Sequence, residues 1–273
     1  MNKYKILDNI NNMKKILFTG ARSGIAKNVI DKLIKLNKYY IYITVHTEKE
    51  ETCIKNIYNN TKNITCFKLD ITKKEDRNKV INLNIDILVC NAAIGISGSL
   101  IEIPIYKVKE NFNVNVFSNL ELIQLTLKNM LKNQNGKIII ISSLAGIIPI
   151  EFLGSYCATK ASIIMLAKVL QKELKIVNPN IKIKIIEPGI YKTGFNEIMI
   201  DNKNIDNSKY FKSKKNDIEI KDYIMFDFLA HKKLNSISKQ IIKAIQEDNN
   251  KLIYKAPFFQ SIFSKIYQIF KSW

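Results

Sequence analysis

The chain has 273 residues, of which 47% are hydrophobic and 25% are charged, and its formal net charge is +19. No stretch has the roughly 18 consecutive apolar residues that a membrane-spanning helix needs, and the polar residues 1–12 lack the apolar core of a secretory signal. We therefore expect a soluble, cytoplasmic protein in which residues 1–273 form a single domain, with residues 1–12 either a disordered extension or upstream of the natural start at Met13.

Apolar runs alternate with segments of helical periodicity along most of the chain. The runs are continuous, as in "KIIIIS" at 137–142, and continuous runs suit strands buried on both faces of a parallel sheet. Strand and helix in regular succession predict a doubly wound α/β fold with a parallel sheet in three layers. The predicted strands are 14–19, 39–45, 64–70, 85–90, 137–142, 181–187 and 251–257, and the predicted helices are 28–36, 107–133, 156–177 and 236–250.

The alternation weakens late in the chain. Residues 196–220 are polar, rich in lysine and weakly periodic, and a long irregular segment at this place predicts a substrate loop or lid over 196–235. Residues 258–273 place their apolar side chains at three- and four-residue steps, which predicts an amphipathic C-terminal helix. Its apolar face packs on the domain, closes the substrate pocket or pairs with another subunit; alternatively it contacts a membrane interface, helped by Lys265 and Lys271.

The first predicted turn carries glycines where a dinucleotide site needs them. "TGARSGIA" at 19–26 follows the first strand and opens the first helix. Gly20 permits the tight turn, and Gly24 lets the backbone approach a pyrophosphate, whose charge meets free N–H groups at the helix N-terminus. Ala26 stands where the usual pattern has a further glycine, at a position of close packing that tolerates alanine. A dinucleotide cofactor is therefore expected at this turn.

The end of the second strand selects between two such cofactors. A carboxylate there would hydrogen-bond the ribose 2′-hydroxyl of NAD, but Val45 is followed by His46, and no acid precedes Glu48. Arg22 in the glycine turn can instead pair with a 2′-phosphate, assisted by a protonated His46. We therefore predict NADP (NADPH) as the preferred cofactor, with NAD as the alternative.

The glycine turn and six later motifs together resemble the short-chain dehydrogenase/reductase family. The resemblance spans about residues 14–194 and implies a Rossmann fold and an NAD(P)-dependent oxidoreductase that interconverts a carbonyl and a secondary alcohol by hydride transfer. The six later motifs are "LDIT" at 69–72, "CNAA" at 90–93, "NVNVFS" at 113–118, "ISSLAG" at 141–146, "YCATK" at 156–160 and "PGIYKT" at 188–193.

The resemblance also implies roles for individual residues. Tyr156 would donate the proton in ketone reduction and act as the base in alcohol oxidation, and Lys160 would hold the nicotinamide ribose. Ser143, chosen over Ser142, would hydrogen-bond the substrate oxygen, and Asn115 would position a water that links Lys160 to solvent. The implied cofactor-binding residues are Gly20, Arg22, Ser23, Gly24, Ile25, His46, Asp70, Asn91, Tyr156, Lys160, Pro188, Gly189, Ile190 and Thr193.

The spacing of Tyr156 and Lys160 supports an acid–base pair. Four residues apart on a helix, the two side chains share a face. The pKa of a phenol is about 10, so its anion is scarce at neutral pH, and a neighbouring ammonium stabilises that anion and lowers the pKa. A hydroxyl tuned in this way can pass a proton in either direction.

The chain departs from the family in two places. Cys90 and Ala93 alter the "NNAG" segment, which is mainly structural. The C-terminus lacks the "TG…DGG" segment with which many small members build a tetramer, so that tetramer is not expected here, and we predict a homodimer.

Two other functions remain as alternatives. One is an NADP-binding sensor or scaffold without turnover, and the other is an epimerase or dehydratase on a nucleotide sugar, although that subgroup has the tighter spacing TGxxGxxG. Four cysteines and two histidines show no metal-ligand spacing, so no metal is expected, and no nucleic-acid motif is recognisable. We expect a carbonyl reductase for a small substrate that is hydrophobic or, given the lysines of 203–215, anionic.

Overall fold

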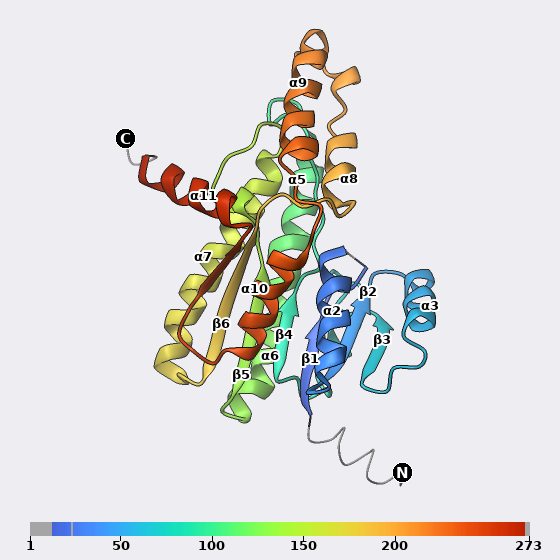
Figure 1. Ribbon diagram of the computed structural model, residues 1–273, viewed down its shortest axis with the longest axis vertical. Helices are drawn as coiled ribbons and strands as arrows, with labels where there is room; N and C mark the ends of the chain where they lie inside the picture. The colour runs from blue at the N-terminus through green and yellow to red at the C-terminus, as the bar shows by residue number, and fades with distance from the viewer. Residues whose placement is uncertain (1–12, 23, 271–273) are drawn as a thin grey trace.

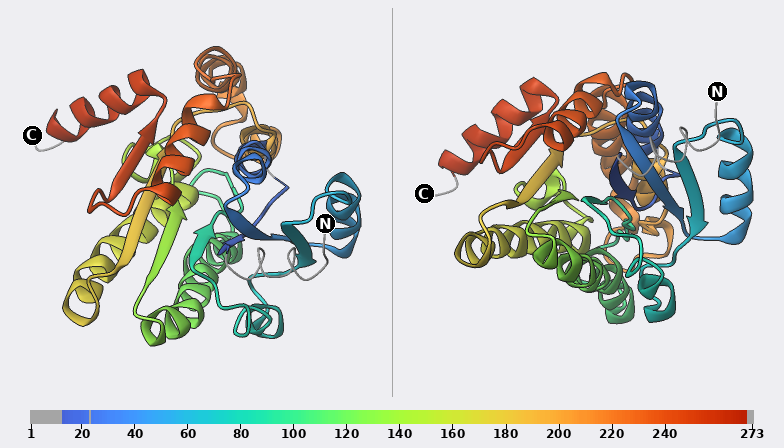
Figure 2. Two further views of the ribbon diagram at one scale, coloured as in Figure 1. Left: turned by 60° about the horizontal axis from the view of Figure 1, so that its bottom comes forward. Right: turned by 90° about the horizontal axis from the view of Figure 1, so that it is seen from below.

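The structure is a computed structural model that describes residues 13–22 and 24–270. Its strands are β1 (Lys14–Phe18), β2 (Tyr39–Val45), β3 (Ile64–Lys68), β4 (Ile87–Cys90), β5 (Gly136–Ile141), β6 (Ile181–Pro188) and β7 (Ile253–Ala256). They form a sheet in the order β3-β2-β1-β4-β5-β6-β7 in which all neighbours are parallel. Helices cover both faces (Figures 1 and 2), so the predicted doubly wound, three-layer α/β fold is confirmed.

The two faces of the sheet lie in separate hydrophobic cores. One face is covered by α2 (Gly24–Leu36), α3 (Glu48–Ile57) and α10 (Asn235–Gln246), and the other by α6 (Asn119–Lys132) and α7 (Gly154–Val177). Along β1, Ile16 and Phe18 contribute to the first core and Leu17 to the second. Because the central strands bury both faces, their apolar runs are continuous rather than alternating.

Three helical segments differ from the prediction. The helix predicted over 107–133 is α5 (Ile105–Phe112) followed by a π-helical segment, η1 (Asn113–Ser118), and then α6. The helices α3 and α4 (Lys74–Asn78) have no counterpart among the predicted elements. Both are short and polar, so periodicity gives them little signal.

The late segment expected to be irregular is helical, and that part of the expectation is wrong. Aromatic side chains anchor it: Phe211 packs edge-on against Phe152 at 5.1 Å between ring centroids, and the Lys203 ammonium lies over the Phe152 ring at 5.5 Å. The segment extends beyond the carboxyl end of the sheet (Figure 1). Its elements are α8 (Phe195–Asp201), η3 (Ile205–Asn207), η4 (Lys212–Lys214), α9 (Lys215–Asp222) and η5 (Tyr223–Phe228).

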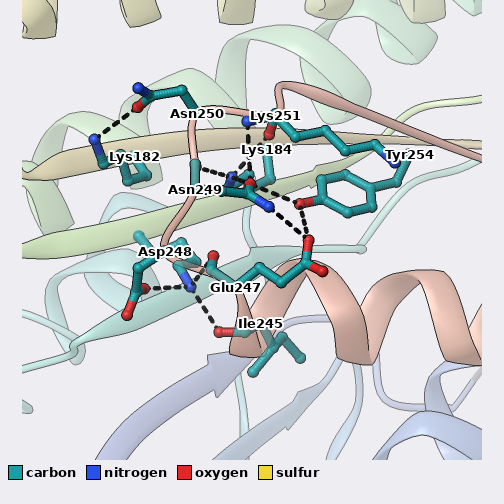
Figure 3. A network of polar contacts seen from close by, with 10 residues as sticks. Lys182, Lys184, Ile245, Glu247, Asp248, Asn249, Asn250, Lys251 and Tyr254 are labelled. Atoms are coloured by element: carbon teal, nitrogen blue, oxygen red, sulfur yellow. Dashed lines mark hydrogen bonds and ion pairs between the residues drawn. The ribbon is translucent and has the colours of Figure 1, made fainter.

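At the amino end of the sheet, two buried lysines hold the loop between α10 and β7 (Figure 3). The Lys184 ammonium donates to the main-chain oxygens of Asn249 and Lys251 and to the Asn249 side chain. The Lys137 ammonium donates to two carbonyls at the end of α10 and pairs with Asp248 at 2.9 Å. Three acceptors therefore surround each ammonium group, and both charges are satisfied inside the protein.

The C-terminal helix α11 (Phe258–Phe270) turns its polar side toward the sheet. Ser261 and Ser264 are its buried residues, whereas Phe259, Phe263 and the other large apolar side chains are exposed. The interpretation in which the aromatic face packs on the domain is therefore wrong, because the small serines make the close contact instead. None of the helices in the described part of the chain is long and apolar enough to cross a membrane.

Some predictions fall on positions that the structure does not describe. These are the extension over residues 1–12, the cofactor contact of Ser23, and the membrane contact of Lys271, all of which lie outside the described residues.

Candidate active site

The glycine turn lies where β1 and β4 adjoin, at the point where the strand order reverses. Gly20 has φ of 67°, and a Cβ there would approach the Ala92 Cα to 2.9 Å, so only glycine fits. The Asn91 amide donates to the main-chain oxygens of Thr19 (3.0 Å) and Gly20 (2.8 Å). Asn91 therefore fixes the shape of the turn, and its predicted contact with the cofactor stays a prediction.

The residues around this turn suit a dinucleotide. Gly24 begins α2, and no acidic side chain stands in the first turn of that helix to compete for its N–H groups. A Cβ on Gly24 would lie 3.7 Å from the Thr193 Cβ, so the segment at the end of β6 adjoins the turn. A pyrophosphate at the start of α2 and a nicotinamide beside Thr193 are thus compatible with the described backbone.

At the adenosine end the structure adds a carboxylate. Arg22 is exposed and pairs with Glu50 at 2.6 Å, and Glu50 also accepts from the backbone N–H of His46 at 3.1 Å. Burial raises the pKa of Glu50, but the Arg22 and backbone hydrogen bonds outweigh it and hold that pKa below its usual value. No acid lies between β2 and Glu48 in the sequence, but α3 folds back and brings the Glu50 carboxylate to the end of β2.

Asp70 and His46 lie together on the same side of the site. His46 Nε2 is 3.4 Å from Asp70 Oδ2, and the other carboxylate oxygen of Asp70 accepts two bonds from Thr72. Burial raises the pKa of Asp70, but the Thr72 and His46 contacts hold it below its usual value. An ionised Asp70 is therefore available to an adenine amino group, as the resemblance implies.

Asn115 lies in the π-helical segment η1, and such segments recur at functional sites. Its side-chain amide donates to the Ile94 oxygen at 2.8 Å and to Thr159 at 3.1 Å, and its side-chain oxygen accepts from the Ile94 N–H at 2.8 Å. The side chain therefore holds the loop after β4. The predicted role of Asn115 in positioning a water stays a prediction.

Tyr156, Ser143 and Lys160 come together at the carboxyl end of β5. Ser143 lies at the Tyr156 hydroxyl and partly opposes the rise that burial causes in the pKa of Tyr156. The Ser143 hydroxyl accepts from the Ala145 N–H at 3.1 Å and donates to the Pro188 oxygen at 3.5 Å. The neighbouring hydroxyl of Ser142 points the other way and donates to the Lys160 carbonyl at 3.1 Å. Of the two serines, Ser143 is the one placed at the Tyr156 hydroxyl.

The Lys160 ammonium lies 5.5 Å from the centroid of the Tyr156 ring and donates to the Ile141 oxygen at 3.0 Å. Within residues 13–22 and 24–270, that carbonyl is its one hydrogen-bond acceptor, so two of its three N–H groups are free for a ligand. Burial lowers the pKa of Lys160 to about 8. A buried lysine with unfilled donors is what a cofactor ribose requires.

The expected lowering of the Tyr156 pKa is absent from the protein alone. Burial raises the pKa of this hydroxyl well above its usual value, and Ser143 only partly opposes the shift. Lys160 is not among the groups that shift this pKa, and burial favours the neutral forms of both side chains. A hydroxyl that keeps its proton suits a proton donor.

An apolar cluster that sequence patterns did not indicate packs around Tyr156. The Phe195 ring of α8 lies 5.9 Å from the Tyr156 ring, and Met199 fills the space above Gly95, where a Cβ would collide with it. The motifs end before these residues, so only the apolar spacing within α8 could have suggested them. The cluster consists of Ala145, Leu153, Tyr156, Met199 and Phe226, with Ile150, Cys157, Ile190, Phe195, Ile200 and Met225 packed against them.

The segment after β6 is tied to the C-terminal helix. The Gln260 side chain accepts from the Ile190 N–H at 2.8 Å and donates to the Leu229 oxygen at 3.0 Å. Gly189 must lack a side chain because its Cβ would overlap Gln260 and crowd Pro257. Pro188, Gly189 and Ile190 thus lie against the start of α11, and their predicted contacts with the cofactor stay predictions. Gln260 is a supporting residue that no motif marked.

Comparisons with known proteins agree with this geometry. A family model described as short chain dehydrogenase matches residues 14–204. The probable short-chain type dehydrogenase/reductase VdlC of Helicobacter pylori is 34% identical over 142 residues, which cover 52% of this chain and 49% of that protein. The match therefore spans about half the length of that relative.

Two further comparisons cover more of the chain. The 3-oxoacyl-[acyl-carrier-protein] reductase FabG of Rickettsia prowazekii is 32% identical over 183 residues, covering 66% of this chain and 73% of that protein. The solved structure described as ElxO with NADP bound is 28% identical, with a TM-score of 0.70, and the match covers 91% of this chain and 99% of that one.

Proposed function

Because the chain belongs to the short-chain dehydrogenase/reductase family, we propose that it is an oxidoreductase that reduces a carbonyl to a secondary alcohol with NADPH. The observation that carries this proposal is the cluster of Tyr156, Ser143 and Lys160 beside the glycine turn. A cofactor-binding scaffold needs the turn but has no use for a buried acid beside a serine hydroxyl.

The residues divide the reaction among them. NADPH, when bound, supplies the hydride to the carbonyl carbon. Tyr156 gives its hydroxyl proton to the carbonyl oxygen, and Ser143 hydrogen-bonds that oxygen as negative charge develops. Lys160 holds the nicotinamide ribose with its free N–H groups and returns a proton toward Tyr156. The raised pKa of Tyr156 in the protein without cofactor keeps its hydroxyl protonated, as a proton donor must be before the carbonyl arrives.

The preference for NADP rests on Arg22. This residue is one of only two arginines in a chain with 41 lysines, and its side chain is 76% exposed beside the end of β2. A guanidinium binds a 2′-phosphate in two-point geometry, and its surface pair with Glu50 is weak enough to exchange. The NADP bound to the ElxO structure supports the same choice.

The apolar cluster around Tyr156 supports a carbonyl compound with an apolar chain. Aliphatic, aromatic and methionine side chains make up the cluster, and methionine adapts to ligands of different shape. In the described state α8 covers Tyr156, and the Ser97 hydroxyl donates to the Met199 carbonyl, so a substrate enters only when α8 moves. A relative named as a 3-oxoacyl reductase supports this substrate class.

The test is the oxidation of NADPH by the purified full chain in the presence of ketones of increasing alkyl length. We expect turnover that improves with chain length and is faster with NADPH than with NADH. Binding of NADPH without turnover of any ketone or aldehyde would favour the sensor or scaffold instead. The variant Arg22→Ala should lose the preference for NADPH over NADH. The variant Lys35→Ala, which removes the same charge at an exposed position, is the control and should keep that preference.

A further inference from the structure

The apolar side of helix α11 faces outward, away from the sheet. Its described apolar side chains other than Tyr267 fall within an arc of about 140° at about 3.6 residues per turn, and the buried serines lie on the opposite arc. Phe259 is 79% exposed and Phe263 is 60% exposed. A surface helix of a globular protein ordinarily turns such a face inward, so this face needs another partner.

The helix extends away from the sheet at the outer edge of the molecule (Figures 1 and 2). β7 is its main neighbour, which Ser261 and Ser264 approach closely because they are small. Lys255 of β7 donates to the Ser264 hydroxyl at 3.4 Å. The polar side of α11 is thus anchored on the sheet, and its apolar side stays open along the whole helix.

Exposed apolar side chains also lie at the end of η5, the segment that Gln260 contacts. The bond from Gln260 to the Leu229 oxygen brings the start of α11 against the end of η5. Next to the Gln260–Leu229 bond, Phe228 is 76% exposed and Leu229 is half exposed. On the other side of the bond, Phe258 and Phe259 precede Gln260 and are exposed as well. Exposed contiguous apolar patches of this kind mark interaction sites.

The charge around this patch is positive. From residue 227 to the C-terminus the chain has eight lysines and three acidic residues, Asp227, Glu247 and Asp248. Asp227, next to Phe228, pairs with Lys192 at 2.7 Å. The other two acids lie in the loop before β7, at the amino end of the sheet, whereas α11 follows the carboxyl end of β7. Lys232 and Lys233 are exposed just beyond η5, and Lys265 borders the apolar arc of α11.

We propose that α11 and the end of η5 dock on an anionic lipid bilayer, with Phe259, Phe263 and Phe228 inserted among the acyl chains. An amphipathic helix that lies in a bilayer surface combines an apolar face with flanking lysines, and its affinity rises with buried apolar area and with lipid charge. Long lysine side chains at the border of the face reach the headgroups. This surface does not depend on the proposed reaction.

The test is co-sedimentation of the full chain with vesicles of phosphatidylcholine and phosphatidylserine. We expect binding that falls by about tenfold or more in pure phosphatidylcholine and weakens as salt is raised, because the electrostatic part is screened. The double variant Phe259→Ser with Phe263→Ser should lose about tenfold or more in binding, because less apolar area enters the bilayer.

A matched control removes two exposed apolar side chains elsewhere, Tyr106→Ser with Ile176→Ser, and should bind vesicles like the original chain. NADPH binding checks that each variant is folded. Vesicle binding that is unchanged in the α11 double variant overturns the proposal. A second pattern of results also overturns it: the wild-type chain does not bind vesicles and sediments as a dimer, and the α11 double variant sediments as a monomer. In that case a second copy of the chain covers the apolar face of α11.

Discussion

Lysines are buried at both ends of the sheet, and they differ in what surrounds them. At the carboxyl end Lys160 is 5% exposed, and at the amino end Lys184 is 1% exposed. Burial lowers the pKa of each to about 8. The Lys184 ammonium has three acceptors, whereas that of Lys160 has the Ile141 carbonyl alone among the described residues.

The pKa therefore does not tell the two lysines apart, but their unfilled donors do. A buried ammonium with three acceptors stabilises the loop that supplies them. A buried ammonium with free donors lowers the free energy of unfolding of the protein without ligand, because its N–H groups have lost their water. A bound ligand that accepts from these N–H groups removes this cost. The difference assigns Lys184 to the fold and Lys160 to the site.

The largest expected effect comes from Lys160→Met. We predict that kcat/KM for ketone reduction falls by about 10²–10⁴-fold, because the ribose contact and the proton path to Tyr156 are lost. The free energy of unfolding should stay the same or rise, since no partly satisfied ammonium remains buried. Steady-state kinetics and urea unfolding measure the two quantities, and a large loss of stability would remove the distinction between the lysines.

The reverse pattern is expected for Lys184→Met. We predict a free energy of unfolding lower by about 2–4 kcal/mol, because the acceptors of Asn249 and Lys251 lose their donor, while kcat/KM stays within about twofold. Lys182→Met is the control, since its ammonium bonds the exposed Asn250 and should change stability by less than about 0.5 kcal/mol. If Lys184→Met and Lys182→Met lower the free energy of unfolding equally, the role given to Lys184 is contradicted.

The pH dependence of stability should be shared by the two lysines. Each has a folded pKa of about 8 against 10.5 for a free lysine, so above about pH 8 the folded chain releases a proton that the unfolded chain keeps. The free energy of unfolding contributed by each group therefore rises from about pH 8 to about pH 10. Urea unfolding across this range should show that the free energy of unfolding rises less steeply with pH in Lys160→Met and in Lys184→Met than in the original chain. If neither variant reduces the slope, the burial of these charges is contradicted.

The smallest expected effect concerns Arg22, a cation whose partner can be exchanged. Glu50→Gln should tighten NADPH binding by up to about fivefold, because it removes a surface ion pair that competes with the 2′-phosphate. Glu48→Gln, the same charge change at the exposed start of α3, should leave the dissociation constant unchanged. Fluorescence titration with NADPH measures both, and weaker binding in Glu50→Gln would show that Glu50 supports the cofactor.

The strands and the motif residues were predictable because each carries a local signal. Seven apolar runs predicted seven strands, each within two residues of its observed bounds. Tyr156 and Lys160 share a helix face by their spacing, and alternation along β5 separated Ser143 from Ser142. Helix α3 also had a signal that was overlooked, since Thr47 and Glu50 form a capping box.

Other features depend on contacts that no local pattern encodes. The capping box returns Glu50 to the end of β2, but the pair of Glu50 with Arg22, 28 residues earlier, depends on how α3 packs beside the glycine turn. The π-helical segment around Asn115 interrupts a helix whose apolar spacing continues through it, so periodicity predicts one helix. In α11 the pattern identified an apolar face, but whether that face points inward depends on the fit of Ser261 and Ser264 against β7.

The most direct test of the account is Tyr156→Phe, which removes the acid and keeps the ring. We predict an NADPH dissociation constant within about twofold of the original and a kcat lower by about 10²–10⁴-fold, because the proton donor is gone. Tyr58→Phe, which removes a hydroxyl bonded to Asp31 on the far side of α2, should keep full turnover. If Tyr156→Phe reduces ketones at the original rate, Tyr156 is not the proton donor and the proposed mechanism is wrong.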